Sequence, residues 1–314
     1  MDGLGLAEVS LFLIGGLALV TLAGGLVAAF VVPARPAALV HARRMSTLRT
    51  TVAMFSGLVV FAAAVVVQIL NPYLEGVPFL IGPLAATATG LTVFATLPPP
   101  TLDGAVRRRI ANLEPRRFKN YSSPAQRRMF VALSGVTVAV VLGSGLTSKS
   151  AADGRSLCTS LFPADCVAGG PYLYPGWLFA APALILIAVL LASMVIALRR
   201  IIRAPGAAWS ELTDADTALR VAAVQLVLRI GSTPLVLTAG LFLGFAGLPL
   251  LNAEVLVTGL SSNGDGIAHL TGFIMVVISA PVLLYGLVLA FVSIIGATVL
   301  PRAASHSTQR ATTS

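Results

Sequence analysis

The strongest constraint in this sequence is a series of long apolar segments. Seven stretches are long enough to cross a hydrocarbon layer as helices, since a layer of about 30 Å needs roughly 20 residues at a rise of about 1.5 Å each. None of the seven contains an acidic residue, so each helix can satisfy its own backbone hydrogen bonds without burying a carboxylate. The predicted spans are residues 9–32, 51–70, 79–97, 129–146, 177–198, 234–251 and 270–299.

Composition excludes a soluble fold. The chain is 57% hydrophobic and only 11% charged, with a mean hydropathy of +0.92, whereas soluble domains are about 25% charged. So few ionic groups could not solvate the surface of a 314-residue globular protein. The predicted fold class is therefore all-α, a polytopic integral membrane bundle of about seven transmembrane helices that forms a single domain over residues 1–300.

The distribution of the basic residues predicts how the helices are threaded. All of the 21 Lys and Arg except Lys149 and Arg155 fall in alternate connections or in the C-terminal tail. Short loops rich in Lys and Arg stay in the cytoplasm, so we expect the N-terminus outside and the C-terminus inside, as an odd number of spans requires. The first span lacks a basic segment before it and is expected to be a retained helix rather than a signal peptide.

Composition also suggests the source of the chain. Its bias towards Arg over Lys, with abundant Ala, Gly, Val and Leu, indicates a high-G+C bacterial genome. The expected location is therefore the bacterial cytoplasmic membrane, as a multi-pass protein.

Two cysteines are expected to form a disulfide. Cys158 and Cys166 both fall in the connection of residues 147–176, which is predicted to lie outside, where thiols oxidise. Two free thiols are the alternative. A metal site is less favoured because no histidine or third cysteine lies nearby.

The disulfide makes a direct prediction. Alkylation of denatured, unreduced protein should find no reactive sulfur, because both thiols are consumed in the bridge. The same assay after reduction should label two cysteines. Labelling of both cysteines without reductant would show that they are free.

The connection of residues 98–128 is strongly basic. An apolar stripe predicts an interfacial helix at about residues 104–114, whose arginines would lie against anionic lipid. We favour this over nucleic-acid binding, because the cytoplasmic bias already accounts for the charge and no recognition motif accompanies it. The candidate lipid-facing residues are Arg107, Arg108, Arg109, Arg116 and Arg117.

Two further segments are predicted beside the membrane. A second interfacial helix is expected at about residues 210–230, ended by Gly231 and Pro234, because a helix continued to residue 251 would be about twice as long as the bilayer is thick. The polar residues 301–314 are expected to be a disordered cytoplasmic tail.

Polar side chains inside the spans are few, and they are the candidates for chemistry in the membrane. They are Gln68, Asn71, Gln225, Arg229 and Tyr285. Interhelical hydrogen bonding is the simplest role for such groups. The sequence contains no carboxylate in a span, no nucleophile triad, no metal cluster and no nucleotide-binding loop, so no catalytic, cofactor-binding or metal residue is predicted.

Two functions remain from these features. The first is a non-enzymatic accessory or scaffold component whose basic inner face contacts anionic lipid headgroups. The alternative is a small-molecule permease or channel-like transporter whose weakly polar pathway is lined by the five polar residues. A membrane protein partner or a second copy is expected for the first function, but no nucleic acid.

Two patterns concern how the helices are arranged. Gly240-x-x-x-Gly244, followed by Gly247, offers a small-residue face for close helix approach, either within the bundle or between protomers. After the first span the chain reads as three hairpins of the same orientation, and the sequence leaves open whether they are a true repeat.

Overall fold

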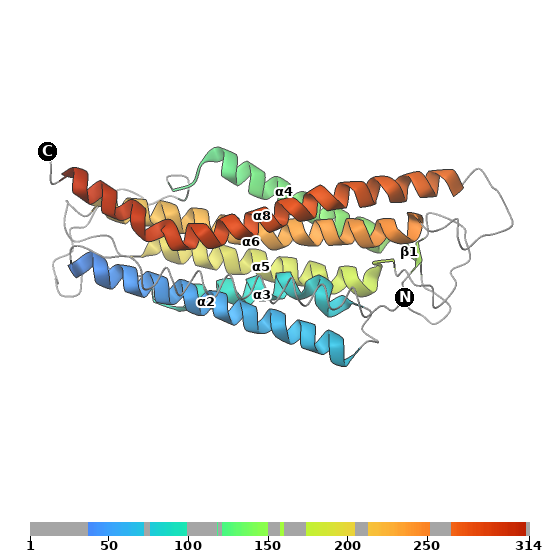
Figure 1. The fold of residues 1–314 in the computed structure, drawn as a ribbon, viewed down its shortest axis with the longest axis horizontal. Helices are drawn as coiled ribbons and strands as arrows, with labels where there is room; N and C mark the ends of the chain where they lie inside the picture. The colour runs from blue at the N-terminus through green and yellow to red at the C-terminus, as the bar shows by residue number, and fades with distance from the viewer. Residues whose placement is uncertain are drawn as a thin grey trace.

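The computed structural model of the chain is a bundle of long helices (Figure 1). It describes residues 37–71, 76–98, 118, 121–149, 158–159, 174–204, 213–251 and 265–311. The elements within these ranges are α2 (Ala37–Leu70), α3 (Val77–Thr96), α4 (Pro124–Leu146), β1 (Ser148–Lys149), β2 (Cys158–Thr159), α5 (Trp177–Arg203), α6 (Thr213–Leu251) and α8 (Asp265–Ala311).

Each of the six described helices contains a segment that is long and apolar enough to cross a membrane. The segments are Leu48–Leu70, Val77–Thr96, Pro124–Leu146, Trp177–Arg203, Arg220–Leu251 and His269–Ser293. They overlap the last six predicted spans, so the prediction of an all-helical bundle of membrane-length helices is confirmed. The first predicted span, residues 9–32, and the predicted interfacial helix at 104–114 lie outside the described residues.

Local signals begin two of the helices. Gly76 precedes α3 with a φ of 87°, a left-handed conformation that favours glycine, and its N–H donates to Gln68 Oε1 at 3.0 Å. Ser123 caps α4 by accepting a hydrogen bond from the Gln126 N–H at 3.2 Å, and Pro124 follows it in the first turn. The predicted spans began later, at residues 79 and 129, because they were set by apolar length and not by these signals.

The first hairpin, α2 with α3, depends on glycine. A Cβ added at Gly57 would stand 2.8 Å from the carbonyl oxygen of Ala86, and one added at Gly90 would stand 2.9 Å from that of Ala53. Side chains at either position would collide with the facing backbone. Small residues let membrane helices approach closely in this way, and dispersion then holds them together.

The last hairpin, α6 with α8, is the most extensive helix contact of the described bundle. A Cβ at Gly247 would stand 2.8 Å from the carbonyl oxygen of Gly272, and one at Gly272 would stand 2.5 Å from the backbone nitrogen of Leu251. Gly240 faces Leu283 of α8 in the same seam. The small-residue face predicted on α6 therefore packs within the bundle.

The apolar core is centred on α5 and α6, with α3 and α4 packed around them. Its fully buried side chains include Leu84, Leu190, Leu235 and Phe242. By contrast, α2 and α8 expose many large apolar side chains along their outer faces, including Phe55. Such faces suit contact with lipid, because hydrocarbon solvates them at no cost.

α6 differs from the prediction for its segment. It runs unbroken for 39 residues, so the break expected at Gly231 and Pro234 is absent. Pro234 cannot donate a backbone hydrogen bond, so the carbonyl group of Ile230 loses its usual partner, a loss that helices packed within a membrane bundle can tolerate. In the same stretch, Ser232 Oγ donates to the Leu228 oxygen at 2.6 Å and Thr233 Oγ1 to the Arg229 oxygen at 3.0 Å.

α8 also differs from the prediction. Helix continues from the apolar segment to Ala311, so residues 301–311 are helical where a disordered tail was expected. A proline at position 301 removes one hydrogen bond but does not end the helix. Adding residues to an existing helix costs much less than starting one, and Ala, Arg and Gln in this segment favour helix.

A short β pair lies between α4 and α5. β1 and β2 are antiparallel, with Lys149 opposite Cys158. Cys166 lies outside the described residues, so its pairing with Cys158 stays a prediction. Close to the pair, Thr147 Oγ1 and the Tyr174 hydroxyl are 2.6 Å apart and join the end of α4 to the segment that leads into α5.

Candidate functional site

Two of the five predicted polar residues form hydrogen bonds with the backbone at the turn between α2 and α3. Gln68 accepts the hydrogen bond from Gly76 that precedes α3. Asn71 is exposed and donates through Nδ2 to the carbonyl oxygen of Val67, at 3.2 Å. Both side chains therefore complete backbone hydrogen bonding where α2 ends and α3 begins.

The other three lie on α6 and α8. Gln225 and Arg229 are half-buried in the first half of α6. Tyr285 is 40% exposed on α8, next to Gly286, which packs against Leu237. That contact places Tyr285 about two turns of α6 beyond Arg229, roughly 12 Å along the axis.

The five residues therefore do not form one cluster. Gln68 and Asn71 lie at the last turn of α2 and Tyr285 on an exposed face, so no continuous polar lining joins them in the described residues.

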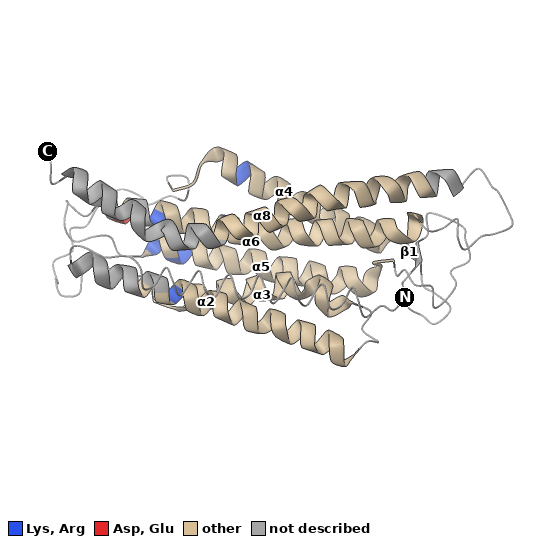
Figure 2. Ribbon diagram, in the orientation of Figure 1, with Lys and Arg blue, Asp and Glu red and all other residues tan. Residues whose placement is uncertain are grey.

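A different constellation stands out at one end of the bundle. The arginines whose side chains the structure describes gather towards the end at which α5 finishes and α6 starts (Figure 2), whereas Lys149 lies in β1, between α4 and α5. We call this region the arginine end and define it by Arg49, Arg200 and Arg220. Each of the three donates to backbone carbonyl groups at the C-terminal end of a neighbouring helix.

Arg49 is the most deeply placed of the three. It is 4% exposed, its Nε donates to the carbonyl oxygen of Phe94 at 2.6 Å, and its guanidinium carbon lies 3.9 Å from the centre of the Phe94 ring. A cation over an aromatic face is stabilised by the ring quadrupole. Arg49 Nη2 is buried without a hydrogen-bond partner among the described residues.

Arg200 acts on the same helix end from α5. Its Nη1 donates to the carbonyl oxygen of Ala95 and to that of Thr96, the latter at 3.1 Å. Together with Arg49 it reaches three successive carbonyls at the end of α3. The last four carbonyls of a helix have no partner within the helix, and they form the negative end of its dipole, so cations are favoured there.

Arg220 bonds to the C-terminal end of α5 in the same way. Its Nη1 donates to the carbonyl oxygens of Ile201 and Ile202, at 3.0 and 3.3 Å, from a side chain that is 6% exposed. Its Nε forms an ion pair with Asp216 one turn earlier on α6, at 2.9 Å. The start of α6 is thereby fastened to the end of α5.

Hydroxyl groups supply the polar contacts deeper in the bundle. Most of them donate to a carbonyl three or four residues earlier in their own helix, as Ser193 Oγ does to Val189. A few also cross between helices: Thr92 Oγ1 and Ser193 Oγ are 2.9 Å apart, and Thr137 Oγ1 donates to the Leu235 oxygen at 3.0 Å. Two of the described hydroxyl contacts therefore join helices, and most of the others stay within one helix.

The bond between Thr92 and Ser193 can be measured with a double-mutant cycle. Thr92→Val, Ser193→Ala and the double variant should give a coupling free energy of about 0.6 kcal/mol, the average for such bonds in membrane proteins. Unfolding by sodium dodecyl sulfate in mixed micelles provides the three free-energy differences. A coupling of zero would mean that the two hydroxyls do not bond to each other.

Several of the residues singled out by the sequence are not covered by the described part of the structure. Arg107, Arg108, Arg109, Arg116 and Arg117, the candidate lipid-facing residues, are outside the described residues, as is Cys166. Sequence reasoning counted Arg49 and Arg200 only as charges on one side of the membrane. The available signal was their position at the first or last turn of an apolar segment, but the helix end that they contact is not evident from spacing.

The residues that the structure describes contain no group of three His, Cys, Asp or Glu that could hold a metal ion. Comparisons of the chain with protein-family models, with curated proteins and with solved structures found no match.

Proposed function

We propose that this protein is a non-enzymatic accessory or scaffold component of a bacterial cytoplasmic membrane. The observation that carries the proposal is the use made of the interior polar side chains. Most of the described hydroxyls bond to helix backbone or to one another, as with Thr92 and Ser193, although Thr238 Oγ1 has no partner in that part of the chain, and the three arginines of the arginine end bond to helix ends. These contacts hold helices in place, which is the requirement of a scaffold.

The alternative, a permease with a weakly polar pathway, needs its candidate residues to converge. Gln68 is occupied by the N–H of Gly76, Asn71 is exposed at the end of α2, and Tyr285 lies on an exposed face. Their separation favours the scaffold role. The alternative would regain support if solute flux in proteoliposomes depended on Gln225 or Arg229.

An accessory role predicts a stable complex. The tagged chain, expressed at its natural level and extracted in a mild detergent, should elute with a mass above that of one protomer. It should do so with a stoichiometric membrane protein partner or a second copy. The variant Gln225→Leu should elute in the same way, because the proposal gives that residue no contact with a partner. Recovery of a lone monomer from native membranes would contradict the proposal.

We further propose that the arginine end faces the cytoplasm, with seven spans and the N-terminus outside. Support comes from the gathering of the described arginines at one end (Figure 2). In a chain with both native cysteines replaced by serine, an impermeant thiol reagent applied to intact cells should label Asp153→Cys and spare Arg108→Cys. The reverse labelling pattern would invert the topology.

A further inference from the structure

We propose that the arginine end holds a binding site for a phosphate group, supplied by the headgroup of a phospholipid. The site lies where α2, α3 and α5 meet, and its donors are Arg49 and Arg200. The proposal concerns two defined guanidinium groups at the end of α3. It is distinct from the general affinity of a basic surface for anionic lipid.

The first argument is an unsatisfied donor. Arg49 is 96% buried by area, since only 4% of it is exposed, and its Nη2 has no acceptor among the described residues. A buried N–H group without an acceptor is costly, and more so when it carries charge, so most such groups in proteins have a partner. An acceptor that is not part of the described chain would satisfy Nη2.

The second argument is unbalanced charge. Arg49 and Arg200 donate to successive carbonyl groups of α3, those of Phe94 and Ala95, so two positive charges converge on one helix end and repel each other. Their described acceptors are carbonyl groups of α3, which carry only partial negative charge. The carboxylate of Asp216, on α6, is paired with Arg220 of the same helix. An anion between Arg49 and Arg200 would turn their repulsion into attraction.

The third argument is access. Arg200 is exposed, and its bonds to α3 use Nη1. A guanidinium group has five N–H donors arranged as a planar fork, so further donors remain on the same side chain. Arg200 can therefore offer donors to a ligand from the surface, beside the α3 carbonyl group that Arg49 contacts.

The chemistry of the donors points to phosphate. A phosphate group has several oxygen acceptors, which can receive bonds from two guanidinium groups at once, and arginine favours such forked contacts. A single neutral acceptor, such as water, would satisfy Nη2 but would leave the repulsion between the two cations.

The position along the helices points to a lipid as the source. Arg49 is the second residue of the apolar segment Leu48–Leu70, and Arg200 lies in the last turn of Trp177–Arg203. Ends of membrane-length helices stand at the level of the headgroups, where lipid phosphates are concentrated. A lipid phosphate there needs no path into the bundle interior.

Native mass spectrometry of the full-length protein in detergent tests the site. Wild-type protein should retain dioleoyl phosphatidylglycerol, and Arg200→Gln should bind it about tenfold more weakly, the loss expected for one charge-assisted contact. The matched control is Arg203→Gln, which removes the same charge from an exposed position one turn away on α5. The control should bind like wild type.

Each outcome is decisive. If Arg200→Gln retains the lipid as well as wild type does, or if Arg203→Gln loses it equally, the defined site does not exist. Arg200→Lys keeps the charge and serves as a control for misfolding as the cause of lost binding. It should elute as wild type on size exclusion and show an intermediate affinity, because a point charge replaces the fork.

A competition arm identifies the source of the phosphate. Inorganic phosphate at millimolar concentration should leave the bound lipid in place, because the acyl chains add affinity that the free ion lacks. Displacement of the lipid under these conditions, with Arg200→Gln insensitive to phosphate, would overturn the lipid assignment and leave free phosphate as the ligand.

Discussion

Gly272→Ala is expected to destabilise the folded bundle by about 2–3 kcal/mol, the upper part of the usual range for overpacking. The added Cβ would stand 2.5 Å from the backbone nitrogen of Leu251 and 2.8 Å from the carbonyl oxygen of Gly247. Both neighbours are backbone atoms, which cannot turn aside as a side chain can. Titration with sodium dodecyl sulfate in mixed micelles would measure the change in unfolding free energy.

The chain offers a matched control with the opposite sign. Gly135 on α4 has nothing within 4 Å of an added Cβ, so Gly135→Ala should be neutral or stabilise by about 0.5–1 kcal/mol through the better helix propensity of alanine. If the two substitutions had equal effects, the close approach of α6 and α8 would not be present in the protein.

Arg220→Met should also cost about 2–3 kcal/mol of unfolding free energy. The substitution keeps most of the side-chain volume but leaves the carboxylate of Asp216 unpaired and removes a donor from the carbonyl oxygens of Ile201 and Ile202. Removing one partner from a buried ion pair costs about 3–5 kcal/mol. The 20% exposure of Asp216 places the expected value below that range.

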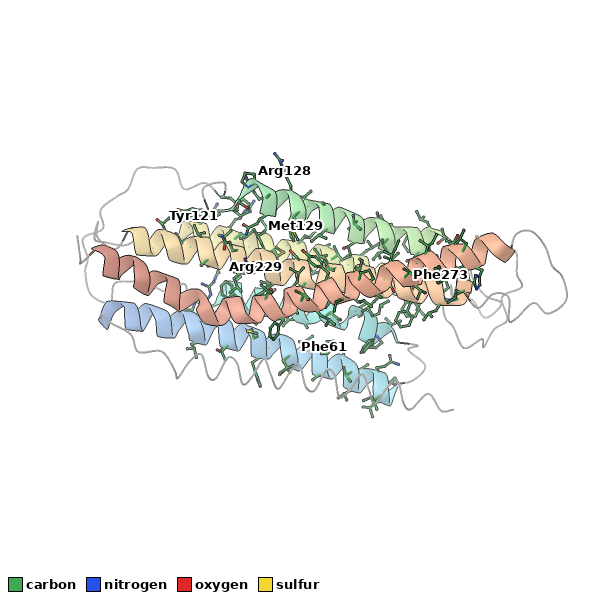
Figure 3. All side chains as sticks on the ribbon, turned by 45° about the horizontal axis from the view of Figure 1, so that its top comes forward. Phe61, Tyr121, Arg128, Met129, Arg229 and Phe273 are labelled. Atoms are coloured by element: carbon green, nitrogen blue, oxygen red, sulfur yellow. The ribbon has the colours of Figure 1, made fainter. Side chains whose placement is uncertain are left out.

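Two variants separate the geometry of Arg220 from its charge. Arg220→Lys retains a cation but not the fork that reaches three acceptors, so it should recover part of the loss. Arg128→Met removes an arginine that extends from α4 away from the bundle (Figure 3) and should change stability by less than about 0.5 kcal/mol. Thermal unfolding in detergent would rank the three variants. Equal losses in Arg220→Met and Arg128→Met would mean that net charge, not the contacts of Arg220, sets stability.

The helices could be predicted because bilayer thickness dictates the length of an apolar segment. The predicted segments 79–97 and 177–198 correspond to Val77–Thr96 and Trp177–Arg203. The observed helices are longer than the predicted spans where polar residues continue a helix past its apolar part. At the end of α5, for example, arginines extend the helix. The continuation of α6 through Pro234 could not be predicted, because it depends on packing against α4, α5 and α8.

The candidate site was less predictable. Arg49 bonds to a residue 45 positions away and Arg200 to one 105 positions away, and no local pattern encodes such pairs. A cytoplasmic bias accounts in the same way for all the arginines except Arg155, so it could not single out the ones that cap helix ends. Gln68 and Tyr285 looked alike as polar residues in apolar segments, but packing of the helices gave them unrelated surroundings.

The seam between α6 and α8 has a consequence for the surrounding bilayer. Where Gly247 meets Gly272, the two backbones lie too close to admit even one methyl group. An acyl chain therefore has no place between these helices. Changes in lipid length or unsaturation should act on this pair only through its outer surfaces, and swelling the membrane with short-chain alcohols should leave the seam closed after looser contacts have opened.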